Sequence, residues 1–310
     1  MDFNHKPVML IPAIAALNIQ PDGIYVDATA GGGSHSAEIA KVLTTGRLIA
    51  IDQDPDAVQA AAKRLKPYSN AKVVHSNFSR LDQVLASEDI KKIDGILFDL
   101  GVSSHQLDTP ERGFSYHGEA PLDFRMSRQG ATAADLINQL TEQELTKILF
   151  DYGEEKYARS IARNIVKVRA EIAIKTTVQL NEIISASVPA AYKRQGHPAR
   201  KSYQAFRIAL NRELEVLEEA LQKAFDYLNP GGRIAVITFH SLEDRIVKRR
   251  FADWCRGCDC STELPVCVCG KTPQVALFNK KPIQADECEL QENQRSRSAK
   301  LRVCIKHEAH

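Results

Sequence analysis

Gly23-Ile24-Tyr25-Val26-Asp27-Ala28-Thr29-Ala30-Gly31-Gly32-Gly33-Ser34-His35-Ser36 is the stretch that decides the fold. Its first half, Ile24 to Ala28, predicts a short buried strand, and a helix from Ser34 to Leu43 is predicted directly after three consecutive glycines. Glycines in such a turn accept unusual backbone dihedrals and let a ligand approach bare N–H groups. The stretch therefore predicts a nucleotide-type cofactor site, although a tight turn without a ligand has the same pattern.

A second apolar run, Arg47 to Asp52, ends in an acid about twenty residues beyond the glycines. A carboxylate at this place can accept hydrogen bonds from both hydroxyl groups of a ribose, which favours an adenosine-containing ligand. NAD stays open on this observation, although the dinucleotide-binding pattern is incomplete because Ser36 stands at its last glycine position.

Strands and helices continue to alternate as far as Asp99. Helices are predicted at Pro55–Leu65 and Asp82–Ile90, and strands at Lys72–His75 and Ile93–Asp99. This alternation predicts a doubly wound α/β fold with a parallel sheet, in which ligands bind at the carboxyl ends of the strands. The residues that fall at those ends are Gly31–His35, Asp52, Phe78 and Asp99.

The middle of the chain changes character, since residues 106–202 contain helical patterns and no convincing strand. A long amphipathic helix, Ser202–Leu228, then leads through Asn229–Gly232 into a buried strand, Arg233–Phe239, so the chain returns to the sheet. The last strands are predicted at Ala276–Ile283 and Ala299–Lys306. We therefore expect an α/β domain made of residues 1–105 and 203–310, with an inserted helical domain at 106–202.

The composition is that of an ordinary globular protein, with 44% hydrophobic and 26% charged residues and a net charge of +2. The early apolar run Val8–Ile19 is too short to span a bilayer and contains Pro12, so we expect a cytoplasmic protein without a membrane partner. Basic residues cluster late in the chain, for example at Arg245–Arg250. Such clusters suit a phosphate backbone, although each alone is also typical of a solvated helix face.

All seven cysteines lie beyond residue 254. Cys258 and Cys260, with Cys267 and Cys269, could provide four thiolates to one tetrahedral zinc ion, with Cys255 as a spare ligand. A loop of reduced cysteines is the alternative, and disulfides are not expected in a cytoplasmic protein.

These motifs resemble class I S-adenosylmethionine-dependent methyltransferases, in particular Asp27–Gly33, Asp52 and Leu228–Gly232. Over nearly its whole length the chain is similar to the bacterial small-subunit (16S) ribosomal RNA cytidine N4-methyltransferase family. The further motifs that carry this likeness are His5–Val8, Asp99–Asp108, Glu111–Ser115, Pro121–Met126, Tyr152–Glu155, Ile161–Arg163, Phe239–Lys248 and Arg295–Arg302.

The resemblance implies a Rossmann-like methyltransferase sheet and a helical insert that recognises the substrate. It implies methyl transfer from S-adenosylmethionine to a cytidine N4, with 16S ribosomal RNA or a small-subunit particle as partner. The cofactor-binding residues that carry over are Gly33, Ser34, His35, Asp52, Phe78, Asp99 and Gln106. Ser34 departs from the family pattern, in which a glycine is usual, and His105 replaces a frequent proline.

Methylation of an exocyclic amine requires precise positioning and a hydrogen-bond acceptor, because the lone pair of that amine is delocalised into the ring. Asp99 is the first candidate catalytic residue, and it could accept from the target amine or from the cofactor. His240 is the second, with a histidine that only stabilises the fold as its alternative. Since an amine needs no covalent intermediate, we expect direct displacement without a cysteine adduct.

Two other functions remain compatible with the sequence. The first is a DNA or protein methyltransferase on the same domain, and the second is a non-catalytic ribosome-assembly factor that retains the glycine turn. Phe114, Tyr116 and Phe124 could stack on a base or form the core of the insert. The exact nucleotide and the oligomeric state are not defined by these patterns.

Overall fold

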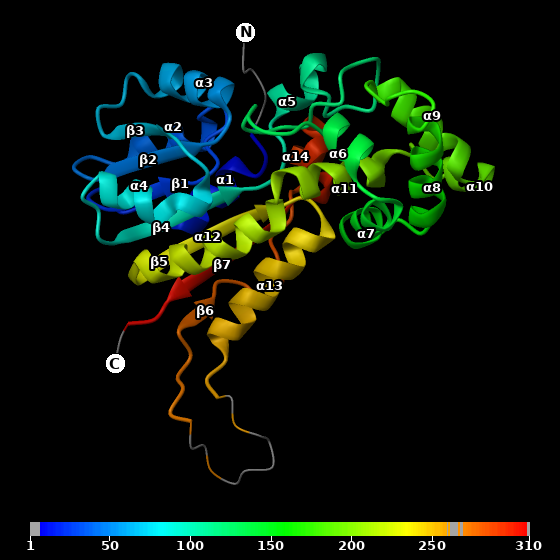
Figure 1. Cartoon of the computed structure of the whole chain (residues 1–310). Coiled ribbons are helices and arrows are strands. Elements are labelled where there is room, and N and C mark those ends of the chain that lie inside the picture. The colour runs from blue at the N-terminus through cyan, green and yellow to red at the C-terminus, as the bar shows by residue number, and fades with distance from the viewer. Residues whose placement is uncertain (1–6, 259, 261–265, 267–268, 309–310) are drawn as a thin grey trace. The chain divides into compact units, whose positions relative to one another are not determined.

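The computed structural model describes residues 7–258, 260, 266 and 269–308 (Figure 1). The chain divides into two compact units: the first contains Met1–Gly101 and Leu214–His310, and the second contains Val102–Glu213. The predicted insert, 106–202, is therefore shorter at both ends than the second unit.

The first unit is built on a seven-stranded sheet with the order β3-β2-β1-β4-β5-β7-β6. The strands are β1 (Ile24–Asp27), β2 (Arg47–Asp52), β3 (Ala71–His75), β4 (Ile93–Asp99), β5 (Leu228–Thr238), β6 (Val275–Leu277) and β7 (Lys300–Lys306). Strands β1 to β5 are parallel, whereas β7 runs antiparallel to both β5 and β6. Strand order reverses direction between β1 and β4, the place where doubly wound sheets bind ligands. The predicted α/β fold is confirmed.

Helices cover both faces of this sheet. Two separate apolar cores result, one on each face. The first contains side chains from α4 (Leu81–Ser87), α12 (Glu213–Tyr227) and α13 (Ser241–Cys255), and the second contains side chains from α1 (Leu10–Leu17), α2 (Ser34–Val42) and α3 (Pro55–Leu65). The helices of this unit are α1 (Leu10–Leu17), α2 (Ser34–Val42), α3 (Pro55–Leu65), α4 (Leu81–Ser87), α12 (Glu213–Tyr227), α13 (Ser241–Cys255) and α14 (Glu287–Glu292), with 3-10 turns η1 (Phe78–Arg80) and η3 (Gln294–Ser298). None of the helices in the described part of the chain has the length and apolar character needed to span a bilayer.

The second unit consists of helices around its own apolar core, which includes Phe124, Leu145, Ile161 and Phe206. Four of these helices begin with a capping box, in which a serine or threonine hydroxyl and the side chain three residues later exchange hydrogen bonds with backbone N–H groups. The elements are α5 (Ser104–Asp108), η2 (Pro110–Arg112), α6 (Ala133–Gln139), α7 (Glu142–Gly153), α8 (Ala158–Arg169), α9 (Thr177–Ser187), α10 (Ala190–Lys193) and α11 (Arg200–Asn211).

The prediction of one helix over Ser202–Leu228 is wrong. The chain breaks at Arg212, which has a φ of 52° and lies between α11 and α12. The Asn211 amide donates to the backbone oxygen of Phe124 at 2.8 Å, and Arg207 pairs with Glu213 at 2.8 Å. Apolar residues continue at helical spacing on both sides of the break, so periodicity alone could not locate it.

The last two strands differ in how well they follow the pattern. β7 (Lys300–Lys306) lies within one residue of the prediction, because its apolar side chains alternate as in a half-buried strand. The strand predicted at Ala276–Ile283 ends early as β6 (Val275–Leu277), and only an isolated bridge joins Ile283 to Leu301.

Candidate functional site

The glycine turn between β1 and α2 is held by backbone conformations that favour glycine. Gly31 has a φ of 52° and Gly33 a φ of 77°. A Cβ on Gly33 would lie 3.1 Å from the Cα of Ala61 in α3, whereas one on Gly31 would meet only Thr29, at 3.9 Å. Gly33 is therefore required for close helix packing, and Gly31 faces open space.

Gly33→Ala should lower the free energy of unfolding by about 2–4 kcal/mol, since it adds a clash with α3 to a strain of roughly 1–2 kcal/mol for a left-handed backbone. Gly231→Ala is the matched control, because Gly231 has the same φ of 77° and no atom within 4 Å of an added Cβ. Urea unfolding of both variants measures the difference. If both variants lose the same free energy of unfolding, the packing of Gly33 against Ala61 contributes nothing to stability.

Two carboxylates fasten this turn, and Asp27 is buried whereas Asp52 is partly buried. Asp27, at the end of β1, accepts from the Thr29 N–H at 3.2 Å and from the Ser36 hydroxyl at 2.5 Å. Asp52, at the end of β2, accepts from the Gly31 N–H at 2.8 Å and from the Asp54 N–H at 2.9 Å. Burial raises the pKa of each of these two aspartates to about 6. The ends of β1 and β2 are thus tied to one another through the glycine backbone.

Asp99, at the end of β4, lies beside His35 at the start of α2. The His35 Nδ1 is 3.7 Å from the Asp99 Oδ2, and the Asp99 N–H donates to the Thr29 hydroxyl oxygen at 2.6 Å. Burial lowers the pKa of His35 to about 4, so its ring is neutral at pH 7. Burial and the nearby charges of Asp27 and Glu243 raise the pKa of Asp99 well above its usual range.

Two polar atoms of this pair are buried without a hydrogen-bond partner among the described residues, namely Asp99 Oδ1 and His35 Nε2. Buried polar atoms are rarely left unpaired, because the lost hydrogen bonds to water are not replaced. Asp99 also keeps 24% of its side chain exposed. The pair is therefore suited to a ligand that supplies the missing hydrogen bonds.

Ser34 and Phe78 border the same edge of the sheet. The Ser34 hydroxyl accepts a hydrogen bond from Arg64 of α3, which gives this serine a structural use. The Phe78 ring packs edge-on against Phe98, with 5.6 Å between ring centroids, and is itself only partly buried. Asn77 caps the turn that carries Phe78 by accepting from the Ser79 N–H at 2.9 Å.

His240 begins α13 as its N-cap residue. Its Nδ1 accepts from the Glu243 N–H at 3.4 Å, while its Nε2 lies 3.0 Å from the Glu243 Oε1. The buried Glu243 carboxylate also accepts from the backbone N–H of Phe239 at 2.9 Å. The structure therefore uses His240 to fix the chain after β5.

Gln106 belongs to the second unit, where it is 5% exposed. It forms a capping box with Ser103 at the start of α5: its Oε1 accepts from the Ser103 N–H at 2.9 Å, and its own N–H donates to the Ser103 hydroxyl at 3.2 Å. Phe114 and Phe124 stack on one another in the core of this unit, with centroids 6.1 Å apart. Core packing is thus the role that the structure gives to these two rings.

The structure brings most of the predicted residues together in the first unit. Gly33, Ser34 and His35 follow β1, and the other positions follow neighbouring strands: Asp52, Phe78, Asp99 and His240. Two further contributors were missed. Glu243 has the spacing of a capping-box acid, three residues after the cap, which could have revealed it. Thr29 carries no such signal.

The edge formed by these strand ends is acidic. Among the described residues, Asp27, Asp52 and Asp99 form no ion pair with lysine or arginine, and Glu243 adds a fourth carboxylate nearby. Uncompensated carboxylates favour ligands with a positive charge or with hydroxyl donors. The arrangement is suited to a nucleoside-like cation bound against the glycine turn.

Known proteins match this chain over almost its full length. The model of the MraW methylase family matches residues 2–307. The chain is 52% identical to a protein of Clostridium botulinum (strain Kyoto / Type A2) named ribosomal RNA small subunit methyltransferase H, with 99% of this chain and 100% of that protein covered. It is 53% identical to a protein of the same name from Lachnospira eligens, covering 98% of each.

A solved structure of an rRNA methylase from Streptococcus thermophilus is 12% identical to this chain. The alignment covers 98% of this chain and 99% of that one, with a TM-score of 0.43. The family assignment therefore follows from the sequence comparisons.

Proposed function

Since this chain belongs to the MraW methylase family, we propose that it transfers a methyl group from S-adenosylmethionine to the N4 amine of a cytidine in small-subunit (16S) ribosomal RNA. The names of its relatives at 52% and 53% identity support ribosomal RNA as the acceptor. The structural observation that carries the proposal is the acidic edge beside the glycine turn, where Asp99 Oδ1 has no hydrogen-bond partner among the described residues. An RNA substrate of this kind would place the enzyme in the cytoplasm.

The residues at this edge match the chemistry of S-adenosylmethionine, which supplies an electrophilic methyl group on a positively charged sulfur. Gly31 and Gly33 have no side chains, so a ligand could approach the backbone of the turn closely. Asp52, which accepts from the Gly31 N–H, would also accept from ribose hydroxyls. Phe78 would border the adenine. Ser34, His35 and Asp99 would face the remainder of the cofactor. The uncompensated carboxylates would favour the cationic sulfonium.

Affinity for S-adenosylmethionine should fall as the pH decreases through about 6, the raised pKa of Asp52. The sign follows because hydroxyl donors and a cation favour the ionised carboxylate, which exists above that pKa and is lost below it. The loss should approach tenfold per pH unit at most for one group. Calorimetric titration across this range measures it, and Asp52→Asn should flatten the profile. A profile that stays level in the unmodified protein would contradict the role of Asp52.

Asp99 is our candidate for accepting a hydrogen bond from the target amine or for orienting the cofactor beside it. Its raised pKa means that a cation nearby would restore its negative charge. We assign His240 an indirect role, since both of its ring nitrogens face Glu243. No cysteine precedes residue 255, so attack by the amine itself, without an enzyme–RNA adduct, is the step that these residues support.

We further propose that α13 contacts the RNA backbone. A cavity of about 370 Å³ lies between α12 and α13, and three of its lining residues are Arg245, Arg249 and Arg250. Arg245 and Arg249 are exposed, so their charges can reach phosphates. The helical second unit would supply further recognition of the substrate.

The double variant Arg245→Ala/Arg249→Ala should weaken RNA binding by about tenfold. The slope of the logarithm of the binding constant against the logarithm of the salt concentration should become less steep by roughly 0.7 per lost phosphate contact. Arg47→Ala is the matched control, because Arg47 is also exposed but lies at the start of β2 and pairs with Glu88 at 3.1 Å. Filter binding at several salt concentrations measures both effects. An equal response of the two variants would remove α13 from the interface.

The function is tested by supplying the purified chain with radiolabelled S-adenosylmethionine and unmethylated small-subunit rRNA, free and in particles. Labelled N4-methylcytidine, identified by mass mapping, is the expected product. Labelling of DNA or protein instead would favour the first alternative. If no acceptor is labelled and Asp99→Ala still supports ribosome assembly, the chain is a non-catalytic assembly factor.

A further inference from the structure

The segment 256–274 connects α13 to β6 and is held together at its base. The Gln274 N–H donates to the Trp254 backbone oxygen at 2.8 Å, which places the two ends of the segment side by side. Gly257 packs so closely on Pro273 that an added Cβ would lie 2.9 Å from the proline ring. Neither helix nor strand occurs among the described residues between these ends.

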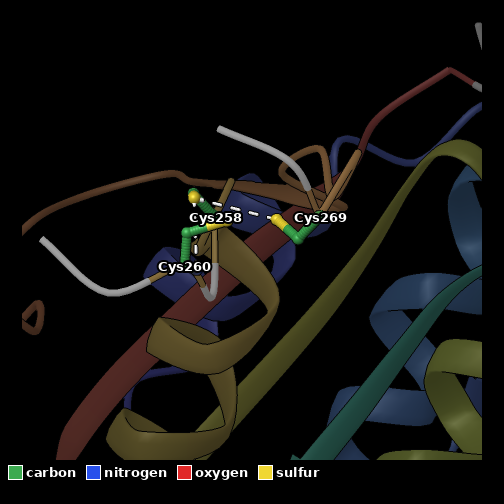
Figure 2. A group of neighbouring side chains, drawn as sticks. All are labelled: Cys258, Cys260 and Cys269. Atoms are coloured by element: carbon green, nitrogen blue, oxygen red, sulfur yellow. Dashed lines mark hydrogen bonds between the residues drawn. The ribbon is translucent and has the colours of Figure 1, made fainter. Parts of the chain in front are cut away.

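Three thiols gather within this segment (Figure 2). Cys258 and Cys260 come from its first part and Cys269 from its second, and their sulfur atoms all lie within 4.8 Å of one another. The sulfur atoms of Cys258 and Cys269 are 3.7 Å apart. We call these three residues the thiol cluster.

The thiol cluster is compact enough for its three sulfurs to bind one metal ion. Four sulfurs at about 2.3 Å from a central zinc lie about 3.8 Å from one another, close to the distance between Cys258 and Cys269. A disulfide would require about 2.05 Å. The geometry therefore fits joint coordination better than a covalent bond between the two sulfurs.

Two backbone features accompany the cluster. The Cys260 N–H donates to the Cys258 sulfur at 3.3 Å, and such a bond stabilises the negative charge that a metal ligand must carry. Gly270, directly after Cys269, has a φ of 62° and open space at its Cβ position, so the chain can turn away from the sulfur at once. The hydrogen bond and the turn at Gly270 thus accompany the three side chains.

The neighbouring Cys255 is not part of the cluster. It packs against the apolar core at the end of α13, and burial raises the pKa of its thiol. Cys304, in β7, is fully buried in the same core. Both sulfurs are thus suited to apolar packing, so the expectation that Cys255 is a spare ligand finds no support in its surroundings.

We propose that Cys258, Cys260 and Cys269 bind one zinc ion, which fastens the two arms of segment 256–274 to each other. Each thiol releases its proton to solvent as its sulfur binds, and no electron is transferred. The fourth predicted ligand, Cys267, lies outside the described residues, and binding by the three thiols does not require it. The family description and the names of the relatives concern methyl transfer, so the support for zinc is this geometry alone.

Metal analysis of the full chain, purified without chelators and after refolding with zinc, tests the site. We expect one zinc per chain, and loss of more than half of it in Cys258→Ser and in Cys269→Ser. Cys288→Ser is the matched control, because Cys288 is an exposed cysteine on α14 and should leave the zinc content unchanged. Absence of zinc from the unmodified chain after refolding, or full retention in both variants, overturns the proposal.

A second measurement guards against variants that fail to fold. The unmodified chain is stripped with a chelator and refilled with cobalt, which shows sulfur-to-metal charge-transfer absorption only when thiolates bind it. Zinc should also slow proteolytic cleavage within residues 256–274 several-fold, whereas cleavage elsewhere stays the same. No absorption and no protection would overturn the site. Neither readout depends on methyl transfer, so failure here leaves the proposed function standing.

Discussion

Asp99→Ala should reduce the rate of methyl transfer about 10²- to 10⁴-fold, the range for losing a positioned hydrogen-bonding or proton-accepting group. Asp99 ends β4 at the acidic edge, and its Oδ1 is the buried carboxyl oxygen there that lacks a partner among the described residues. The truncation would remove both the acceptor and the charge. Single-turnover transfer of labelled methyl groups to rRNA measures the loss.

This loss should occur without unfolding. Burial and the charges of Asp27 and Glu243 disfavour ionised Asp99, so removing its carboxylate relieves repulsion in the native state. Its backbone N–H can still donate to Thr29. We therefore expect the thermal midpoint of Asp99→Asn to equal or exceed that of the unmodified protein, while its activity falls.

Asp82→Ala provides the matched control. Asp82 is an aspartate of the same unit, 39% exposed and paired with Lys223 at 2.7 Å. Its replacement should change the transfer rate by less than about twofold, because exposed ion pairs contribute little. If Asp99→Ala retains activity comparable to this control, Asp99 has no part in the chemistry.

The location of the site could be predicted because it follows from the parallel sheet. Strands were recognisable as apolar runs, and the carboxyl ends of adjacent parallel strands must meet at one edge. Asp52 and Asp99 are far apart in sequence, yet each is the last residue of a largely buried strand. The order of strands and helices was enough to predict that both residues lie at the same edge of the sheet, and hydrophobic patterns reveal that order well.

The details that could not be predicted depend on contacts between distant residues. The break at Arg212 is fixed by Asn211, whose amide reaches the backbone of Phe124, and no local pattern encodes that contact. The boundary of the second unit moves with this break, since α11 carries Phe206 into the core of the insert. Tertiary packing thus decided where one domain ends.

His240 illustrates a different limit. Its position after β5 made it a candidate for catalysis, and the sequence left open whether it served chemistry or structure. In the structure, the Glu243 side chain lies against the His240 ring and also accepts a hydrogen bond from the Phe239 N–H, so His240 is held in a structural contact. A motif search restricted to serine or threonine caps would miss this capping box, whereas the spacing of the acid three residues after the cap is the usual one.

Asp52→Ala should weaken S-adenosylmethionine binding by roughly 1.5–3 kcal/mol, or about 10- to 150-fold, the scale for losing charge-assisted hydrogen bonds. The structure adds a second cause for this loss. Asp52 also accepts from the N–H groups of Gly31 and Asp54, so its truncation loosens the glycine turn itself. The two causes can be separated experimentally.

A cofactor analogue lacking the ribose hydroxyls separates them in a double-mutant cycle. If Asp52 binds the hydroxyls, the analogue should bind the unmodified protein weakly and lose little more affinity in Asp52→Ala. If Asp52 acts only through Gly31, the variant should weaken both ligands by the same factor. Calorimetry of the four combinations distinguishes the outcomes, with Asp82→Ala as a control that should change neither affinity. An unchanged affinity of Asp52→Ala for S-adenosylmethionine would remove Asp52 from the site and would show that its hydrogen bonds to the turn do not affect binding.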